Sequence, residues 1–306
     1  MGTESKGRVG VVGLGIMGSS IAKHLVKAGF EVIGTDLVAD AKAELVKNGG
    51  KAVSSTPEVG KSCRYIILSL ASEPALYRVC GELANSCADG TIVLETGTLP
   101  LAGKQKMQKL LAEKGIFLLD CTLSGTGAQA KNKDLAVYTS GDAEALKKVD
   151  SIIAAFSRVH YNLGEFGNGT KMKFVANLLV AIHNVAAAEA ILLGVRSGLD
   201  PVNLVKVIGD GAGSSRMFQV RGNMMATRTW DEEITMKNTT WQKDMKLIGE
   251  FLQSTETPAP LFSACIPIYI AAVTSGHATH DTGAVYEILE RLTLSAEESK
   301  TQTAKA

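Results

Sequence analysis

The chain has 306 residues, of which 45% are hydrophobic and 21% are charged, and its net charge at pH 7 is +1. This composition is typical of a folded, water-soluble protein, and the length is sufficient for two domains that each bury a core. A charge so close to neutral gives no electrostatic reason to expect a nucleic acid or a membrane as partner, so we expect the partner to be a small molecule.

Five cysteines are scattered along the chain without a C-x-x-C pair or a Cys/His cluster at metal-ligand spacing: Cys63, Cys80, Cys87, Cys121 and Cys265. We expect them to be reduced thiols in a reducing compartment, and we expect no metal site. The first residues lack the basic and apolar segments of a secretion signal, and Lys6 stands where a myristoylation signal needs Ser or Thr. These features predict a cytoplasmic protein.

The first informative segment is a short apolar strand, Arg8 to Val12, followed by a glycine-rich turn and an amphipathic helix. The turn reads Gly13-Leu14-Gly15-Ile16-Met17-Gly18, which matches G-x-G-x-x-G. In dinucleotide-binding proteins the first glycine permits the turn, the second lets the backbone approach a pyrophosphate, and the third lets helix and strand pack. The helix N-terminus adds N–H donors and a positive dipole. The motif alone would also fit an ordinary loop, but in this context it predicts a dinucleotide site.

A carboxylate follows at the distance that such a site requires. The second strand, Glu31 to Thr35, ends in Asp36, about twenty residues after the glycines, where a carboxylate accepts hydrogen bonds from the adenosine ribose. Its charge would repel the 2′-phosphate of NADP, and Leu37 and Val38 follow it where a compensating Arg would be needed. The sequence therefore predicts NAD as the cofactor, with NADP less favoured.

The chain divides into two parts of different character. Further strands are expected at 65–70, 91–95, 117–119, 135–139 and 158–161, with helical patterns between them. This alternation predicts an α/β Rossmann-type doubly wound sheet, mainly parallel, over residues 1–165. Helices are then expected at 171–194, 201–208, 218–226, 243–251 and 258–275, so that residues 166–295 form an all-α C-terminal domain. The polar segment 296–306 is expected to be a disordered tail.

One apolar segment, Phe174 to Val195, is long enough to span a bilayer. Polar residues interrupt it, among them His183 and Asn184, and no positively charged flank pairs with a second hydrophobic segment. We therefore expect a helix that is buried between domains or between subunits. His183 has no second His or Cys at helical spacing and is interpreted as a core or interface residue rather than as a metal ligand.

A lysine and an asparagine stand one helical turn apart at the start of that helix. Lys173 and Asn177 face the same way, and Asn184 falls on the same stripe. A lysine is costly to bury as a cation, so burial would lower its pKa and suit it to general acid/base chemistry. The alternative is a lysine whose stem lies along the helix while its ammonium group reaches solvent.

A glycine-flanked loop is expected after the strand at 117–119, at the carboxyl edge of the sheet, where open α/β sheets bind ligands. It runs from Asp120 to Ala128 and includes Ser124, Gly125 and Thr126, whose hydroxyl and amide groups could hold a carboxylate. The alternative is an ordinary turn between a strand and a loop.

Together these motifs resemble the β-hydroxyacid dehydrogenase family, which includes 3-hydroxyisobutyrate dehydrogenase, tartronate semialdehyde reductase and L-threonate dehydrogenase. The resemblance covers nearly the whole chain, with four matching segments: Gly13 to Gly18, Asp120 to Gly125, Gly167 to Asn177 and Lys243-Asp244. It implies that Lys173, rather than Lys171, is the catalytic general acid/base. It also implies the other site residues: Ser124, Gly125 and Thr126 as a carboxylate clamp, Asn177 as an orienting partner, Leu70, Thr98 and Lys243 as cofactor contacts, and Asp281 as a C-terminal acidic position.

The implied reaction transfers a hydride between NAD and the hydroxyl-bearing carbon of a small 3-hydroxy acid, or reduces the corresponding semialdehyde or keto acid, in a homodimer or homotetramer. Thr126 stands where the family usually has Gly, which adds a hydroxyl and removes room. We therefore expect multiply hydroxylated acids, such as threonate or glycerate, to be better substrates than 3-hydroxyisobutyrate. Ser214, Ser215 and Asn238 are expected as further substrate partners.

Two other functions are found on this scaffold. A non-catalytic dinucleotide-binding reader would bind the cofactor without turnover, and an imine reductase would act on a C=N bond. Both resemble this chain but carry a different residue where Lys173 stands. Lys173 therefore favours the hydroxyacid dehydrogenase.

Overall fold

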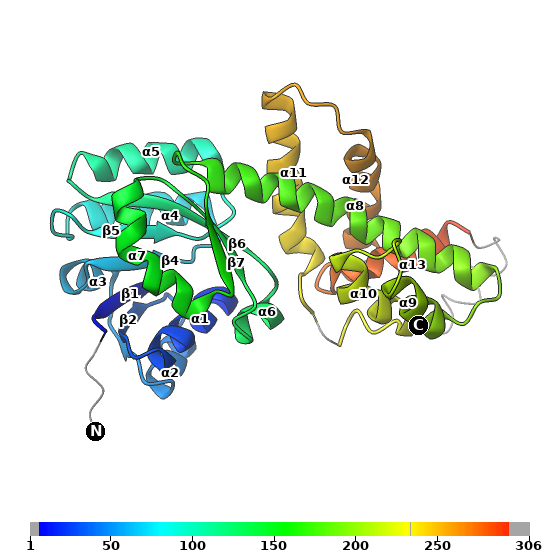
Figure 1. The fold of residues 1–306 in the computed structure, drawn as a ribbon, viewed down its shortest axis with the longest axis horizontal. Helices are drawn as coiled ribbons and strands as arrows, with labels where there is room; N and C mark the ends of the chain where they lie inside the picture. Colours follow the sequence, from blue (N-terminus) through cyan, green and yellow to red (C-terminus); the bar gives the residue numbers. More distant parts are fainter. Residues whose placement is uncertain (1–5, 233, 294–306) are drawn as a thin grey trace. The chain divides into compact units, whose positions relative to one another are not determined.

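The structure is a computed structural model that describes residues 6–232 and 234–293 (Figure 1). Its contacts divide the chain into two compact units, Met1–Lys173 and Phe174–Ala306. The division falls inside one long helix, a few residues after the boundary expected at 165, and each unit is described by itself below. The tail expected at 296–306 lies outside the described residues.

The first unit is built on an eight-stranded sheet with the order β3-β2-β1-β4-β5-β6-β7-β8. The strands are β1 (Arg8–Val12), β2 (Glu31–Thr35), β3 (Lys51–Ala52), β4 (Tyr65–Leu68), β5 (Ile92–Glu95), β6 (Phe117–Ser124), β7 (Ala136–Ser140) and β8 (Val159–Asn162). Strands β1 to β6 are parallel, whereas β7 runs antiparallel to β6 and parallel to β8. The strand order reverses between β1 and β4, which is the switch point where open α/β sheets bind ligands.

Helices cover both faces of this sheet. Successive residues of a strand point to opposite faces, so a strand that is buried on both faces contributes side chains to two separate cores. In β4, Ile67 belongs to the core that includes residues of α1, α2, α6 and α7, while Ile66 and Leu68 belong to the core that includes residues of α3, α4 and α5. These helices are α1 (Ile16–Lys27), α2 (Ala39–Lys47), α3 (Thr56–Ser62), α4 (Glu73–Ala84), α5 (Leu101–Ala112), α6 (Gly127–Lys131) and α7 (Ala143–Phe156). The expected Rossmann-type doubly wound sheet is confirmed.

Two strands differ from the expectation. The strand expected at 117–119 continues to Ser124, because its later residues are buried and pair with β7. Asp120 therefore lies inside a strand, and the loop that was expected to begin there begins at Gly125. Strand β3 was not expected, since two residues are too few to show a periodic pattern.

The second unit is helical. Most of α8 (Asn168–Arg196) belongs to it, together with α9 (Pro201–Gly209), α10 (Arg216–Thr227), α11 (Asn238–Ser254), α12 (Pro260–Ala272) and α13 (Val285–Arg291), with short π and 3₁₀ turns at Val273–His277 and Thr282–Ala284. Its core includes Trp241, Phe262 and Tyr269, all at most 2% exposed. Within the described residues of this unit, β structure is limited to one bridge between Lys237 and Asp281. The expected all-α region is confirmed.

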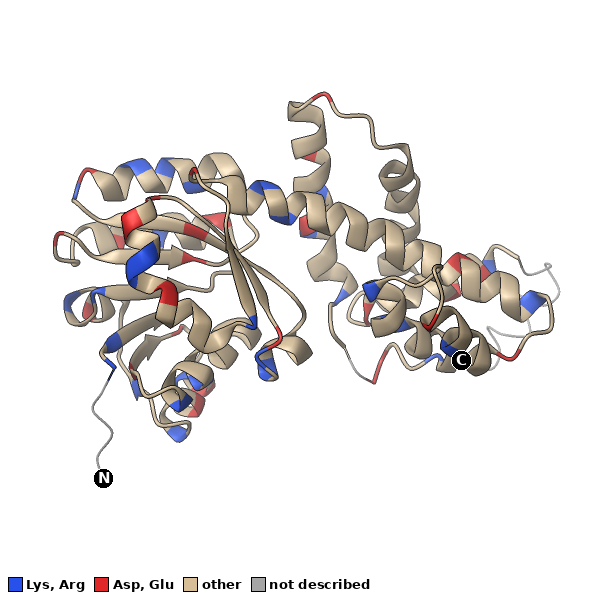
Figure 2. Ribbon diagram, viewed as in Figure 1, with Lys and Arg blue, Asp and Glu red and all other residues tan. Residues whose placement is uncertain are grey.

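Two described helical segments, Asn168–Arg196 and Pro260–His277, are long and apolar enough to cross a membrane. Helix α8 carries few charged residues along its length (Figure 2). Two of its buried polar residues have partners inside the second unit: Asn177 donates to Asp244, and Asn184 donates to the Tyr269 hydroxyl and to the Thr282 carbonyl. Buried polar groups with protein partners are typical of the core helix of a globular domain.

Candidate active site

The glycine-rich turn joins β1 to α1, and its three glycines meet different constraints. Gly13 has φ +91°, and a Cβ there would lie 2.3 Å from the Ser69 carbonyl oxygen. A Cβ on Gly18 would lie 1.9 Å from the Gly13 carbonyl oxygen, so α1 packs directly on the turn. Gly15 is the N-cap of α1 and has open space beside it. The outer glycines permit the turn, and the middle one leaves a helix N-terminus that an anion can approach.

Asp36 follows β2 and is hydrogen-bonded to this turn. Its Oδ2 accepts from the Leu14 amide at 2.6 Å, and its Oδ1 accepts from the Val38 amide at 2.8 Å. The carboxylate is therefore held beside the glycine-rich turn, as the spacing in the sequence predicts. Each oxygen has a second lone pair with which it could accept a hydrogen bond from a ribose hydroxyl.

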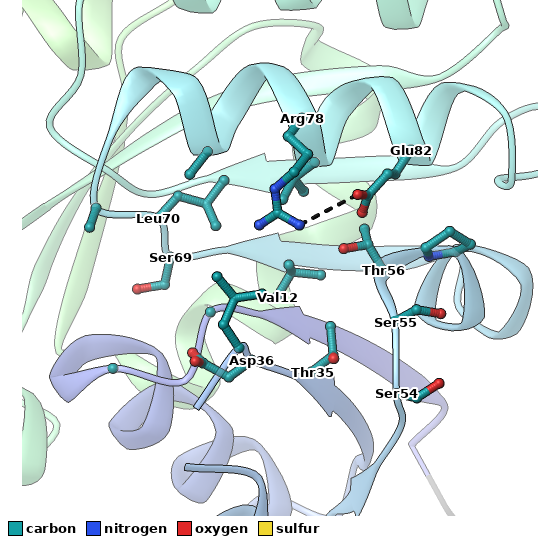
Figure 3. Close-up of a pocket in the computed structure, with 17 residues that line it drawn as sticks. Val12, Thr35, Asp36, Ser54, Ser55, Thr56, Ser69, Leu70, Arg78 and Glu82 are labelled. Atoms are coloured by element: carbon teal, nitrogen blue, oxygen red, sulfur yellow. Dashed lines mark hydrogen bonds and ion pairs between the residues drawn. The ribbon is translucent and has the colours of Figure 1, made fainter. Parts of the chain in front are cut away.

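A pocket of about 520 Å³ opens beside the turn (Figure 3). This volume is within the range of small-molecule sites. Gly13, Gly15, Asp36 and Leu70, four of the expected cofactor residues, line it. The other members of the motif have other positions: Leu14 is buried, Met17 packs against the core, and Ile16 is exposed.

Part of the pocket lining was not predicted from the sequence. These residues come from the segment around the start of α3 and from α4, and they include Ser54, Ser55, Thr56, Arg78 and Glu82. The Arg78 guanidinium lies over the pocket and pairs with Glu82 at 3.5 Å (Figure 3). An Arg and a Glu four residues apart are typical of a solvated helix face, so only the packing of α4 on the sheet reveals that this face borders a pocket.

Beyond the pocket, the loop after β5 contains Thr98, another expected cofactor residue, which is half-buried. Beneath this loop lie three fully buried charged residues, Glu95, Lys104 and Asp120, which we call the Lys104 cluster. The Lys104 ammonium group lies 2.5 Å from Glu95 Oε2 and 2.9 Å from Asp120 Oδ1. Burial disfavours the charged form of Lys104, but the two carboxylates outweigh it and hold its pKa above the usual value. Burial also raises the pKa of Glu95.

The expected carboxylate clamp lies where β6 ends. Ser124 is the last residue of this strand, and Gly125 has φ +141°, where a Cβ would lie 2.7 Å from the Leu135 side chain. Thr126 is the N-cap of α6 and forms a capping box with Gln129. Its hydroxyl accepts from the Gln129 amide at 3.4 Å, and its own amide donates to Gln129 Oε1 at 3.0 Å. Thr126 thus has a local structural role in addition to any contact with a substrate.

The structure distinguishes the two lysines at the start of α8. Lys173 is buried, with 9% of its surface exposed. Lys171 is exposed and donates to Asn168 Oδ1 at 3.1 Å. Of the two, Lys173 has the desolvated setting that a general acid/base requires.

In the second unit, Asp244 connects two other expected site residues. Its Oδ2 accepts from Asn177 Nδ2 at 3.0 Å, and its Oδ1 lies 3.3 Å from Lys243 Nζ. Asn177 and Asp244 are buried, while Lys243 is partly exposed. Asp244 was expected only as part of a sequence match, and in the structure it contacts both of these residues.

Other expected partners have structural roles. Asp281 is fully buried and accepts from Arg221 Nε at 2.7 Å; burial opposes ionisation, but Arg221 and the hydrogen bonds around it hold the pKa of Asp281 below its usual value. Asn238 is also fully buried, and its amide donates to the His277 and Asp281 carbonyls. Ser215 caps α10 by accepting from an amide. Asn238 and Ser215 therefore have structural contacts, and their binding of a substrate stays a prediction.

All five cysteines are free. Burial raises the pKa of Cys63 and Cys80 to about 12 and that of Cys87 and Cys265 to about 11, so their thiols are protonated at neutral pH. Within residues 6–232 and 234–293, no group of three His, Cys, Asp or Glu residues could hold a metal ion.

Comparison with known proteins places this site in a family. Residues 8–164 match the model of the NAD binding domain of 6-phosphogluconate dehydrogenase, and residues 167–289 match that described as NAD-binding of NADP-dependent 3-hydroxyisobutyrate dehydrogenase. The chain is 32% identical to L-threonate dehydrogenase of Cupriavidus necator over 291 residues, which cover 94% of this chain and 97% of the relative. It is 30% identical to the chloroplastic glyoxylate/succinic semialdehyde reductase 2 of Arabidopsis thaliana over 293 residues, 95% of this chain and 80% of the relative.

A solved structure supports the same family as the sequence relatives. The crystal structure of 3-hydroxyisobutyrate dehydrogenase from Salmonella typhimurium is similar to this chain with a TM-score of 0.83 and 26% sequence identity. The similarity covers 92% of this chain and 99% of that one. Both halves of the chain, the glycine-rich unit and the helical unit, are thus accounted for by the same relatives, and the chain belongs to the β-hydroxyacid dehydrogenase family.

Proposed function

We propose that the protein is a dehydrogenase that transfers a hydride between NAD and the hydroxyl-bearing carbon of a small, hydroxylated 3-hydroxy acid. The observation that carries this proposal is a buried lysine, Lys173, in a chain that also has a dinucleotide pocket next to a glycine-rich turn. Family membership supports the reaction class, and the relatives include an L-threonate dehydrogenase.

The residues around the pocket fit a dinucleotide. The open side of Gly15 and the N-terminus of α1 would receive the pyrophosphate, and Asp36 would accept from the ribose hydroxyls. We propose Leu14, Ile16, Met17 and Gly18 as the rest of this binding turn, and Leu70, Thr98 and Lys243 as further cofactor contacts. NAD is preferred over NADP in this proposal, because the Asp36 carboxylate opposes a second anion at the ribose.

The proton chemistry is assigned to Lys173. In the oxidative direction the neutral amine accepts the proton of the substrate hydroxyl while the C–H bond gives up its hydride and a carbonyl forms. When bound, the nicotinamide ring supplies the hydride acceptor at C4. Ser124, Gly125 and Thr126 hold the substrate carboxylate, and Asn177, fixed by Asp244, orients the reacting group.

A second copy of the chain is proposed to cover one face of α8, which would make the protein a homodimer or homotetramer. Val175, Leu179 and Leu193 are 54%, 47% and 70% exposed and recur on one stripe of this helix. Sedimentation of the wild type and of Leu193→Glu tests the assembly, since the charge should shift the protein towards monomer.

We propose that residues 1–165 bind the cofactor and that residues 166–295 bind the substrate and form the contacts between subunits. We also propose that the protein is cytoplasmic.

The substrate assignment is tested with Thr126. Wild-type kcat/KM should be higher for L-threonate and glycerate than for 3-hydroxyisobutyrate, and Thr126→Gly should move this preference towards 3-hydroxyisobutyrate, because room is gained and a hydroxyl is lost. Thr126→Ser is the matched control, since it keeps both the hydroxyl and the helix cap. A wild type that prefers 3-hydroxyisobutyrate would contradict the substrate class, and NAD(H) binding without turnover of any acid would contradict the reaction.

A further inference from the structure

The Lys104 cluster places two like charges opposite each other in the core. Glu95 and Asp120 are directly paired on the parallel strands β5 and β6, and both are fully buried. Lys104, from α5, lies between them. Replacing buried ion pairs by apolar residues is often neutral or stabilising, so stability alone is a weak reason for this arrangement.

One side of the cluster shapes the loop after β5. The Lys104 ammonium group donates to the Gly97 carbonyl at 2.7 Å, and the Gly97 amide donates to Glu95 Oε1 at 2.7 Å. Both backbone groups of Gly97 are thus held by the cluster. The next residue, Thr98, is a proposed cofactor contact.

The other side of the cluster holds the start of α8. Asp120 Oδ2 accepts from the Thr170 amide at 2.7 Å, and Asp120 Oδ1 accepts from the Thr170 hydroxyl at 2.8 Å. A Cβ on the preceding Gly169 would lie 2.5 Å from the Tyr138 carbonyl oxygen, so this turn is pressed against the sheet. Lys173 follows Thr170 by three residues, about 4.5 Å along the helix axis.

We propose that Lys104 is a positioning residue, which fixes the loop at Gly97–Thr98 and the first turn of α8 relative to each other through Glu95 and Asp120. The inference rests on the proposed function of Lys173. A lysine that exchanges a proton during hydride transfer must keep a fixed distance from the cofactor, because a displacement of about 1 Å can cost about 10²-fold in rate. The cluster provides this constraint from beneath both segments.

The sharpest test removes one hydroxyl on the α8 side. Thr170→Val keeps the shape and the bond from the backbone amide to Asp120 but loses the bond from the hydroxyl, and it should lower kcat about tenfold or more while the KM for NAD stays constant. Thr170→Ser should restore kcat. The matched control is Thr139→Val, which removes a hydroxyl bond of a buried threonine to the Tyr161 carbonyl and should leave kcat unchanged at a similar loss of thermal stability.

The coupling is tested with Lys104→Met/Glu95→Gln, which removes two of the three charges together. Because both segments are loosened, kcat should fall and the Kd for NADH should rise. Amide hydrogen exchange should accelerate in peptides covering both 96–98 and 168–174, whereas in Thr170→Val it should accelerate in the second alone.

The exchange measurement does not depend on turnover, so it separates the two proposals. A wild type without dehydrogenase activity would overturn the proposed function, while exchange in the double variant would still report on the coupling. Unchanged exchange at 168–174 in the double variant, or an equal effect of Thr170→Val and Thr139→Val on kcat, would overturn the role of Lys104.

Discussion

Each unit of the molecule buries a charged cluster, and the two clusters connect different segments. In the first unit, the hydrogen bonds of Lys104 and Asp120 reach the loop after β5, which carries a proposed cofactor residue, and the first turn of α8, which precedes the proposed proton-transfer residue. In the second unit, Asp281 accepts from Arg221 and from the amides of residues 235, 236 and 283, which lie just before α11 and α13. A buried charged residue therefore indicates a function only when the groups that it contacts belong to the functional site.

The largest effect is expected at Lys173. Lys173→Met should lower kcat by about 10²- to 10⁴-fold, the range for losing a general acid/base, while the thermal midpoint and the Kd for NADH change little. Lys171→Met is the control, since this exposed lysine should be replaceable. Steady-state kinetics and fluorescence titration provide the measurements. Loss of turnover in Lys171→Met but not in Lys173→Met would reverse the assignment.

Altering the Arg221–Asp281 pair in the second unit should lower stability without lowering kcat. Arg221→Met leaves Asp281 buried without its cation and should lower the free energy of unfolding by about 3–5 kcal/mol, with kcat per folded molecule unchanged. Arg228→Met removes a more exposed pair with Glu290 and should cost about 1 kcal/mol or less. Urea unfolding checks both values. A fall in kcat for folded Arg221→Met would show that the two clusters are less different than we infer.

Asp36 has a structural role and a proposed functional role. It accepts a hydrogen bond from the glycine-rich turn, and it is proposed to bind the ribose. Asp36→Asn removes the charge and should narrow the ratio of kcat/KM for NAD over NADP by about tenfold, corresponding to about 1.4 kcal/mol. Asp36→Ala should narrow the ratio similarly but lower kcat/KM for NAD further, because the bond to the Leu14 amide is lost. A wild type that prefers NADP would contradict the proposed role of the charge.

The smallest effect is expected at the edge of the second unit. His277, whose Nε2 lies 3.3 Å from Glu287 Oε2, and then Arg291 hold the pKa of Glu287 at about 2, below its ordinary value of 4.5. A lowered pKa means that this stabilisation is complete above about pH 4.5 and is lost as the pH falls towards 2. Glu287→Gln should therefore flatten the dependence of the thermal midpoint on pH in this window. An unchanged slope would show that the carboxylate contributes nothing to folding.

The sequence predicted the parts of the molecule whose signals are local. The turn from Gly13 to Gly18 follows a strand and opens a helix, so its function depends on neighbours in sequence, and the carboxylate of Asp36 lies beside it as expected. The distinction between Lys171 and Lys173 was implied by the family resemblance, and the structure shows that Lys173 is buried while Lys171 is exposed.

The sequence did not predict the contacts that depend on packing. Lys104 lies among other lysines of α5 and resembles a solvated residue, and its burial depends on how that helix meets β5 and β6. Asp120 was expected in a loop, because the antiparallel pairing that extends β6 involves a strand that comes later in the chain. Arg78 was missed because its neighbours across the pocket come from segments far away in the sequence.

The rates at which the buried thiols react can report local opening of the structure. Alkylating reagents attack thiolates, and four of the cysteines lie in the first unit while Cys265 lies in the second. The rate at which each thiol is labelled under native conditions would therefore measure how often its surroundings open, one unit at a time. Mass spectrometry of the labelled peptides would then show which of the two units opens more often when either charged cluster is altered.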